Sequence, residues 1–534
     1  MSAAKNAPCP CGSGRKFKSC CMFRAPESSS PEGGVSRWAF RALFGALAVV
    51  YVLALRSYFV GYFNDDAFYL IGAKSLLQGR YVQLHAPTEA AFIQYLPGYP
   101  LLLAPLLAFF AETSVVLQLY SILLLCAALV LLERLWRASS SSGVRFAALA
   151  LFGASPIAVS LSGAVLAEGP YLLWTALVFT ALSRVWERDD AKTWLLVGAL
   201  AGYGALLRPN GICLPVSAAL ALLFSGRFRS AAVCLSAGLA PVGGFYLRNV
   251  FHAGLGTVYL GELRAPFAGG EAGLAQAWTL VGGNAWFYLR AVFVKVFLSW
   301  PEPFASGVLG ALTVAVGAAA ALRGARREGE AGWERCARIH VALYAAVLLV
   351  WFKQAPRYLL PILPFVFLYL FRGLESWTRR LPARAASSVL WGALAAGLLL
   401  CAPLNVHHLR ASLYWATPVN TPALNTFRWI RENTRPDEVF AAEMQGRLYL
   451  YTGRRGWRIP KVEAPLELAR WARGSGVTRI LSASADASMP TVTRTASGEA
   501  LAQPLLERLL SDSRFFEKDF TDARERTAVY RVLP

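Results

Sequence analysis

The chain has 534 residues, of which 56% are hydrophobic and 16% are charged, and its mean hydropathy is +0.43. Soluble proteins carry about a quarter charged residues and disperse their apolar positions, so this composition excludes a soluble globular enzyme. The net charge of +21 comes from 53 Lys and Arg against 32 Asp and Glu. Because these basic residues lie largely in short loops between apolar runs, they indicate membrane topology and contacts with anionic lipid rather than a nucleic-acid partner.

The first 36 residues are polar and form a unit of their own (1–36) that contains four of the nine cysteines: Cys9, Cys11, Cys20 and Cys21. Four thiolates so close together, with glycines that let the chain turn back, fit a tetrahedral structural zinc site. The reducing cytoplasm disfavours disulfides, which leaves incidental cysteines or lipid attachment as alternatives to zinc. The stretch 8–22 resembles the SEC-C zinc motif. This resemblance implies an N-terminal zinc knuckle that acts as an adapter for a cytosolic protein partner, not as a catalytic site.

Apolar runs of about 17–25 residues, the length that crosses a bilayer as a helix, follow one another from residue 38 onwards. Arg37 and Arg41 precede the first run, 38–60, and place the N-terminus in the cytoplasm. This run is long enough to remain as an anchor, so no cleavable signal peptide is expected. Later basic clusters alternate with the apolar runs and predict about 11 transmembrane helices within residues 37–406. Approximate centres of the later spans are Leu151, Leu177, Leu200, Leu220, Leu239, Leu312, Leu348, Phe365 and Leu394.

Three regions then face outward: the first outer loop 61–113, the stretch 252–302, and the tail 407–534. Within the first outer loop, the apolar stretch 95–110 is short and is broken by Pro97, Pro100 and Pro105. We therefore expect a re-entrant or interfacial helix there, and not a span.

The tail is more polar than the rest of the chain. Helix-like stretches at 422–433 and 499–511 alternate with β-rich stretches at 477–482 and 527–533. This pattern predicts a small extracytoplasmic α/β domain over 407–534. The predicted fold class is thus an all-α polytopic membrane protein with a small C-terminal α/β domain.

An acidic pair, Asp65-Asp66, follows the first predicted span. One interpretation is structural: Asp65 caps a short helix, Asp66 stabilises its first turn, and Gly79 ends it. The other interpretation is a reaction centre, and the rest of the chain favours it.

Further motifs stand in order at the ends of predicted spans. They are Asp65-Asp66 with Tyr69, Leu-Pro-Gly-Tyr-Pro at 96–100, Ala-Glu-Gly-Pro at 167–170, Leu-Arg-Pro-Asn-Gly at 207–211, Arg-Tyr-Leu-Leu-Pro at 357–361, Trp-Ile-Arg-Glu-Asn at 429–433 and Tyr-Thr-Gly-Arg at 451–454. This set resembles the GT-C membrane glycosyltransferases, and within them the superfamily of protein O-mannosyltransferases and lipid A aminoarabinose transferases. The resemblance covers residues 37–455 and implies a GT-C type of fold. All the loop elements up to Arg357 fall on the outer face.

The resemblance implies an inverting transfer of a sugar from a polyprenyl-phosphate carrier to an extracytoplasmic acceptor hydroxyl. Such a displacement needs a carboxylate that takes the acceptor proton and cations that hold the departing phosphate. By resemblance, Asp65 is the base and Asp66 its partner or substitute. Glu168 orients the acceptor or shares the proton, unless it is only a charge at a helix N-terminus.

Arg357 is the predicted phosphate clamp, because a guanidinium offers a two-pronged fork to phosphate oxygens. Lys353, one helical turn earlier, supplements it, and Tyr358 belongs to the same substrate-binding motif. Arg208 and His85 are further candidates. The alternative for the arginines is that they extend to the membrane interface.

Two tyrosines of the first outer loop, Tyr95 and Tyr99, are predicted to stack on sugar rings. The alternative is an interfacial aromatic belt.

Two features separate this chain from the protein mannosyltransferases. It has Asp66 where they have glutamate, and it lacks their large internal sensor domain, so the acceptor stays open among lipid, glycan and protein. Asp65, Asp66 and Glu168 could hold a divalent cation, but the relatives implied by the resemblance mostly work without one, so no active-site metal is predicted. The expected location is the bacterial inner (plasma) membrane, with the N-terminus cytoplasmic and the C-terminus extracytoplasmic.

Two other functions compete with glycosyl transfer. A transporter or flippase of a lipid-linked saccharide should have broken helices in paired halves and ionisable residues near the membrane centre, whereas here these residues gather at span ends. A membrane anchor that presents the zinc motif would leave the acidic pair without a role.

Overall fold

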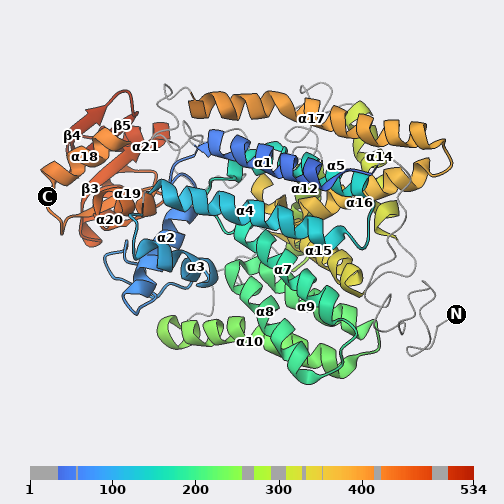
Figure 1. Ribbon diagram of the computed structural model, residues 1–534. Coiled ribbons are helices and arrows are strands. Elements are labelled where there is room, and N and C mark those ends of the chain that lie inside the picture. The colour runs from blue at the N-terminus through green and yellow to red at the C-terminus, as the bar shows by residue number, and fades with distance from the viewer. Residues whose placement is uncertain are drawn as a thin grey trace.

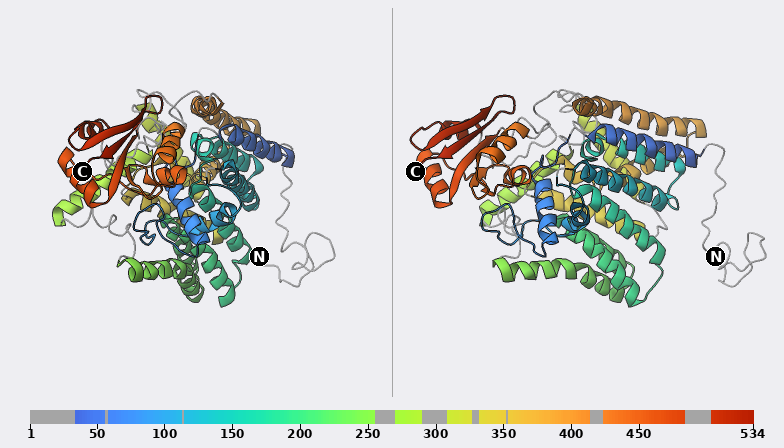
Figure 2. Two further views of the ribbon diagram at one scale, coloured as in Figure 1. Left: turned by 90° about the vertical axis from the view of Figure 1, so that its left-hand side faces the viewer. Right: turned by 60° about the vertical axis from the view of Figure 1, so that its left-hand side comes forward.

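The computed structural model describes residues 34–55, 58–112, 114–254, 270–289, 308–326, 332–351, 353–413, 423–483 and 503–534. Most of them form a body of helices that run side by side, with a small α/β domain at one end (Figures 1 and 2). The helices of the body are α1 (Arg37–Leu53), α2 (Asp65–Leu77), α3 (Gly98–Leu107), α4 (Val115–Trp136), α5 (Ser142–Gly153), α6 (Pro156–Leu161), α7 (Glu168–Val185), α8 (Ala191–Leu207), η3 (Pro209–Ile212), α9 (Cys213–Leu223), α10 (Phe228–Ala253), α12 (Gly270–Trp286), α14 (Val308–Ala325), α15 (Gly332–Val350), η6 (Pro356–Leu359), α16 (Leu363–Thr378) and α17 (Ala383–Leu413).

Short polar side chains begin many of these helices. Ser114, Ser141 and Ser155 accept backbone N–H groups at the starts of α4, α5 and α6, and Asp190 does the same for α8. Each such cap satisfies a donor that the first helical turn leaves without a partner. The apolar stretches that follow pack into one core, whose largest fully buried side chains include Trp136 and Trp194.

The predicted span centres all lie in helices, from Leu151 in α5 to Leu394 in α17. By length and apolar composition, three helices among the described residues are candidate membrane spans, within α4, α10 and α17. Other apolar helices, such as α5 and α9, are shorter. Helix α3 has 10 residues, which at about 1.5 Å per residue is too short to cross a bilayer.

The C-terminal part is the small α/β domain expected from the tail. Its helices are α18 (Leu424–Asn433), α19 (Gln445–Thr452), α20 (Pro465–Gly474) and α21 (Gln503–Leu510), and its strands are β1 (Val439–Ala442), β2 (Gly456–Trp457), β3 (Val477–Ala483), β4 (Phe516–Asp522) and β5 (Thr527–Val532). The strands form one sheet in the order β2-β1-β3-β5-β4, with parallel pairing at β1 and antiparallel pairing at β5. The prediction of a mostly helical protein with a small α/β domain is confirmed.

The first outer loop lies between the helical body and this domain, where α2 and α3 pack together (Figure 1). Its Gly98 begins α3 and touches the end of α8: a Cβ added there would lie 2.5 Å from the carbonyl carbon of Leu206. The Tyr203 hydroxyl donates to the Gly98 carbonyl over 2.9 Å. Glycine therefore lets the loop approach the backbone just before Arg208.

Candidate active site

The acidic pair begins helix α2 and points its two carboxylates at different partners. The residue that precedes the helix is Asn64, at φ 62°, and its side chain makes no capping hydrogen bond. Asp65 and Asp66 lie in the first turn, and Gly79, at φ +71°, follows the end of the helix. The interpretation of Asp65 as a helix cap was therefore wrong, because the helix has already begun at that residue.

Asp65 is bound by two groups from distant parts of the chain. Its Oδ1 accepts a hydrogen bond from the Tyr95 hydroxyl over 2.6 Å, and its Oδ2 forms an ion pair with Arg357. Burial raises the pKa of this carboxyl, but Arg357, Tyr95 and the nearby Lys353 lower it more, so the net shift is downward. The Asp65 side chain keeps 31% of its surface exposed. It is a charged carboxylate that a ligand can reach.

Asp66 is fully buried. Its Oδ2 accepts a hydrogen bond from the Tyr58 hydroxyl and another, of 2.5 Å, from the Gly61 backbone N–H. Burial raises its pKa to about 6, despite these hydrogen bonds. Two adjacent aspartates thus have opposite environments: Asp65 faces an arginine and the outside, and Asp66 faces the protein interior.

Glu168, at the first position of α7, forms ion pairs with two arginines. Its Oε1 lies 3.5 Å from Nη1 of Arg208 and 3.7 Å from Nε of Arg357. Both guanidiniums also lie near the ring of Tyr358, at 5.6 and 5.4 Å from its centroid. Arg357 therefore contacts Asp65 and Glu168 together, and Arg208 adds a second cation to the same buried place.

Prolines place these arginines. Arg208 is extended, at φ −160° and ψ 155°, because Pro209 disfavours a helical residue before it, and α8 ends there. Arg357 lies in the short turn η6, which starts at Pro356. The arginines thus project from helix ends toward the N-terminus of α7, and do not extend to the surface: Arg208 is 6% exposed.

The remaining sequence candidates take different places. Tyr95 orients Asp65, while Tyr99 is fully buried with its ring 5.1 Å from that of Tyr69, so a sugar has no access to its ring in this structure. His85 is buried against Phe68, and burial lowers its pKa to about 4, so it is neutral at pH 7 and supplies no cation.

Part of the sequence, residues 95–242, matches the family model described as dolichyl-phosphate-mannose-protein mannosyltransferase. The structure is similar to that of ArnT from Cupriavidus metallidurans bound to undecaprenyl phosphate, with a TM-score of 0.55 and 15% identity over 93% of this chain and 98% of that chain. It is also similar to the Archaeoglobus fulgidus oligosaccharyltransferase in complex with Zn and sulfate, with a TM-score of 0.54 and 13% identity over 82% of this chain and 67% of that chain. The chain has the GT-C fold. No curated protein matches its sequence.

The resemblance to the GT-C membrane glycosyltransferases is therefore confirmed. The matched segment includes Tyr95, Glu168 and Arg208, whereas Asp65 and Arg357 lie on either side of it. The ion pairs of Arg357 with Asp65 and Glu168 thus join the matched segment to residues that precede and follow it in the chain.

The N-terminal motif is confirmed as a SEC-C motif over residues 6–23. Its four cysteines, Cys9, Cys11, Cys20 and Cys21, lie outside the described residues. Within the described ranges, no group of three or more His, Cys, Asp or Glu side chains could hold a metal ion. Asp65 and Glu168 instead lie on Arg357.

Sequence reasoning missed the residues that hold Asp66. Tyr58 and Gly61 stand just before the acidic pair but belong to no motif of the GT-C resemblance. Arg447, from the α/β domain, contacts the same region and is 386 residues away from Gly61. A single sequence carries no local pattern that would connect them.

Proposed function

We propose that this protein is an integral-membrane glycosyltransferase. It moves a sugar from a polyprenyl-phosphate carrier to an acceptor hydroxyl on the outer face, with inversion at the anomeric carbon. The observation that carries the proposal is the contact of Arg357 with Asp65 and Glu168, because it joins a base, a second carboxylate and a phosphate-binding cation in one place.

The phosphate site is proposed at Arg357 and Arg208, with Tyr358 beside both and Lys353 nearby. A guanidinium fork suits phosphate oxygens, and cations held in a buried place offset the charge that the phosphate gains as it leaves. The similar structure of ArnT, bound to undecaprenyl phosphate, supports a polyprenyl phosphate as the carrier. The acceptor stays open among lipid, glycan and protein.

Asp65 is the proposed base, since it is the exposed member of the acidic pair. Its carboxylate forms an ion pair with Arg357. A donor phosphate at Arg357 would compete for that contact and reduce the effect that now lowers the pKa of Asp65. The carboxylate then becomes a better proton acceptor when the donor is bound.

The proposed reaction is a single displacement. The acceptor oxygen forms a bond to the anomeric carbon as the bond from that carbon to the phosphate oxygen breaks. The acceptor proton goes to Asp65, and the polyprenyl phosphate leaves with the electron pair of the broken bond. Asp66 supports the start of α2, and Glu168 orients the acceptor between the two arginines.

The proposed topology has about 11 spans in residues 37–406, on the length rule for apolar helices. Residues 1–36 lie in the cytoplasm, and the α/β domain 407–534 lies outside, in a bacterial inner membrane. The four SEC-C cysteines bind a structural zinc ion and present the motif to a cytosolic protein. Zinc content that survives the double change Cys20→Ser and Cys21→Ser would contradict the zinc assignment.

The test compares membranes that contain the wild type, Asp65→Asn or Asp66→Asn, each supplied with a set of radiolabelled undecaprenyl-phosphate hexoses and pentoses. Formation of labelled product and release of undecaprenyl phosphate are measured. We expect Asp65→Asn to lower transfer by about 10²-fold or more, the usual contribution of a general base. Wild-type transfer by both variants, at equal amounts of protein in the membrane, would refute the mechanism. Label that crosses the membrane without a new glycosidic bond would instead identify a flippase.

A further inference from the structure

The α/β domain reaches the acidic pair through one arginine. Arg447, on α19, donates from Nε to the carbonyl of Gly61 over 2.8 Å and from Nη2 to the carbonyl of Tyr62 over 3.0 Å. Its guanidinium lies 5.0 Å from the centroid of the Phe59 ring. All three partners belong to the stretch 58–62 just before α2, here called the approach segment.

The other side of the approach segment holds Asp66. Tyr58 and Gly61 donate the two hydrogen bonds to its Oδ2. Gly61 therefore faces Arg447 with its carbonyl and Asp66 with its N–H, at a φ of +92° that favours glycine. A Cβ there would lie 3.1 Å from Cγ of Arg447. The position of one glycine is thus determined jointly by the domain and by the buried aspartate.

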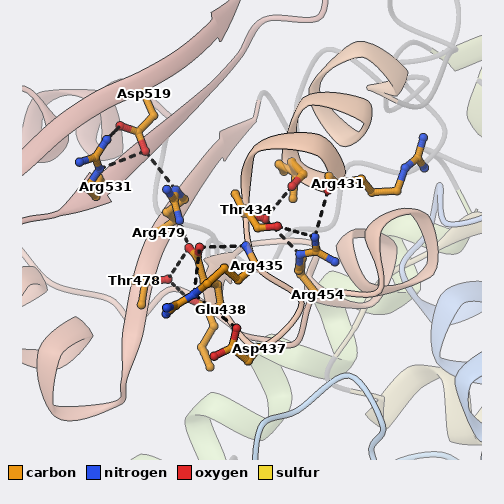
Figure 3. A network of polar contacts seen from close by, with 12 residues as sticks. Arg431, Thr434, Arg435, Asp437, Glu438, Arg454, Thr478, Arg479, Asp519 and Arg531 are labelled. Atoms are coloured by element: carbon orange, nitrogen blue, oxygen red, sulfur yellow. Dashed lines mark hydrogen bonds and ion pairs between the residues drawn. The ribbon is translucent and has the colours of Figure 1, made fainter.

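Helix α19 is itself fixed within its domain. Arg454 donates to the carbonyls of Thr434 (2.7 Å) and Arg431 (3.2 Å), at the end of α18 (Figure 3). It also donates to the carbonyl of Thr452 (3.2 Å), at the end of α19. Such contacts hold the last carbonyls of a helix, which lack partners within it. On α19, Tyr451 lies one turn after Arg447 and donates to the carbonyl of Val60 over 2.9 Å. The helix therefore offers two side chains of one face to the approach segment.

From these contacts we infer that Arg447 is a positioning residue for glycosyl transfer. Through it the α/β domain holds the approach segment, which in turn fixes Asp66 and the first turn of α2, from which Asp65 projects. The inference rests on the proposed function, since it assigns Arg447 to the same reaction centre. A displacement of about 1 Å in a reacting group can lower a rate by about 10²-fold.

Charge adds a second effect of Arg447. The titratable groups that face Asp66 are Tyr58, Tyr99 and Tyr451, and the cation beside them is Arg447. The raised pKa values of Tyr99 and Tyr451 keep these two hydroxyls neutral near pH 7. Loss of the arginine removes a cation that lowers the pKa of Asp66, so this pKa, now about 6, rises further.

The experiment uses the full chain in lipid nanodiscs, with the undecaprenyl-phosphate sugar that supports transfer by the wild type. We expect Arg447→Ala to lower kcat by about 10- to 100-fold while KM for the donor stays within about threefold, because a misplaced base affects the transition state more than donor binding. Arg447→Lys should recover part of kcat, since it keeps the charge but not the two-pronged contact. The pH at which the stabilisation by protonated Asp66 is lost, followed by the unfolding temperature, should rise in Arg447→Ala and stay nearer the wild-type value in Arg447→Lys.

The matched control is Arg455→Ala. Arg455 also joins the domain to the first outer loop, through an ion pair with Glu89, but it does not contact the approach segment. This variant should keep wild-type kcat. An equal loss in both alanine variants would overturn the inference, because general docking of the domain would then explain it. Wild-type kcat in Arg447→Ala would overturn it too.

A second measurement does not depend on activity. Hydrogen exchange of the peptide that contains Gly61 and Asp66 should become faster in Arg447→Ala and stay unchanged in Arg455→Ala, and equal exchange in all three proteins would overturn the inference. If Arg447→Ala fails to accumulate, Arg447→Lys decides: an unchanged kcat and unchanged exchange would overturn it. Wild-type transfer by both Asp65→Asn and Asp66→Asn would reject the proposed mechanism itself, whatever the Arg447 variants do. An inactive Asp65→Asn with fully active Arg447 variants would reject only this inference.

Discussion

Two clusters in this protein alternate carboxylates with arginines, and they are built differently. In the α/β domain the order is Glu438, Arg479, Asp519 and Arg531 (Figure 3). At the candidate active site the order is Asp65, Arg357, Glu168 and Arg208. Each cluster has two carboxylates and two arginines. Only the second cluster contains a buried nitrogen, Nη1 of Arg208, that has no hydrogen bond to a described residue.

The domain cluster is closed because a sheet sets its spacing. Arg479 and Arg531 are direct neighbours on β3 and β5, and Asp519 comes from β4 beside them. Arg479 Nε lies 3.0 Å and Arg531 Nη2 2.7 Å from Asp519, while Glu438 accepts from the Arg435 backbone N–H over 3.0 Å in addition to its pair with Arg479. These distances are those of full hydrogen bonds.

The active-site cluster is open because its members come from the ends of four separate elements. The two contacts of Glu168 are 3.5 and 3.7 Å, longer than hydrogen bonds, and Nη1 of Arg208 is buried without a hydrogen bond to any described residue. Buried polar groups normally have partners, and a group left without one costs about 1–3 kcal/mol. The comparison indicates that the domain cluster stabilises the fold, and the buried Nη1 of Arg208 is consistent with the phosphate site proposed above.

The strongest way to break this comparison is to exchange one arginine for lysine in each cluster. Arg357→Lys should lower kcat/KM by about 10²- to 10³-fold, because an ammonium cannot replace a fork between two carboxylates and the phosphate. Arg479→Lys should leave the transfer rate within about twofold of the wild type, since none of the proposed substrate-binding residues belongs to the domain cluster. Both are measured in the transfer assay at equal protein in the membrane. Equal losses would erase the distinction.

The free energy of unfolding should depend strongly on the arginine at the centre of the domain cluster. Arg479→Ala leaves the side chains of Glu438 and Asp519, 9% and 7% exposed, without their shared arginine. We expect a loss of about 3–5 kcal/mol in the free energy of unfolding, as when one partner of a buried ion pair is removed. Thermal unfolding of the purified protein in detergent measures it. Arg514→Ala, which breaks a pair with Asp512 whose arginine side chain is 78% exposed, should cost at most about 1 kcal/mol.

A pH series sharpens the comparison, because Asp66 is bound by a hydroxyl and a backbone N–H instead of an arginine. Its pKa is raised to about 6, so the folded state binds the proton more tightly than the unfolded chain, whose aspartates titrate near pH 4. That stabilisation is full below pH 4 and is lost as the pH rises through 6. The wild type should therefore lose on the order of 2–3 kcal/mol relative to Asp66→Asn between pH 4 and 7. Parallel unfolding temperatures across this range would contradict the assignment.

The smallest expected effect concerns Glu168. Glu168→Gln removes the carboxylate that competes with phosphate for Arg208 and Arg357. We expect kcat to fall by about tenfold, as an acceptor-orienting contact is weakened, while KM for the donor does not rise. A rise in donor KM without a fall in kcat would show that Glu168 serves donor binding instead.

Much of the site could be predicted because its members stand at helix boundaries that the sequence marks. Pro209 and Pro356 stand beside the two arginines, and the acidic pair and Glu168 begin helices next to apolar runs. Their common location on the outer face stays a prediction, argued from the alternation of basic loops. The fold class and the α/β character of the tail followed from composition and periodicity.

Pairwise contacts could not be predicted, because they depend on how distant elements pack. Nothing local distinguishes Tyr95, which orients Asp65, from Tyr99, which is buried in the core. The contact of Arg447 with Gly61 joins the α/β domain to the stretch just before α2, 386 residues earlier, and a lone glycine in the sequence does not predict it. Helix lengths were also underdetermined, since serine caps such as Ser155 divide an apolar run into α5 and α6.

Gly98 has a consequence for how the protein can change over generations. Its contact with Leu206 is between two backbones, so no neighbouring side chain can be made smaller to accommodate a larger residue at 98. Most packing defects can be rescued by a second substitution nearby, but this one could be relieved only by moving the end of α8, and Arg208 with it. In a selection for active variants from a library at positions 98 and 206, we expect glycine to persist at 98 whatever residue occupies 206. Position 98 and the backbone that carries Arg208 are therefore expected to change together or not at all.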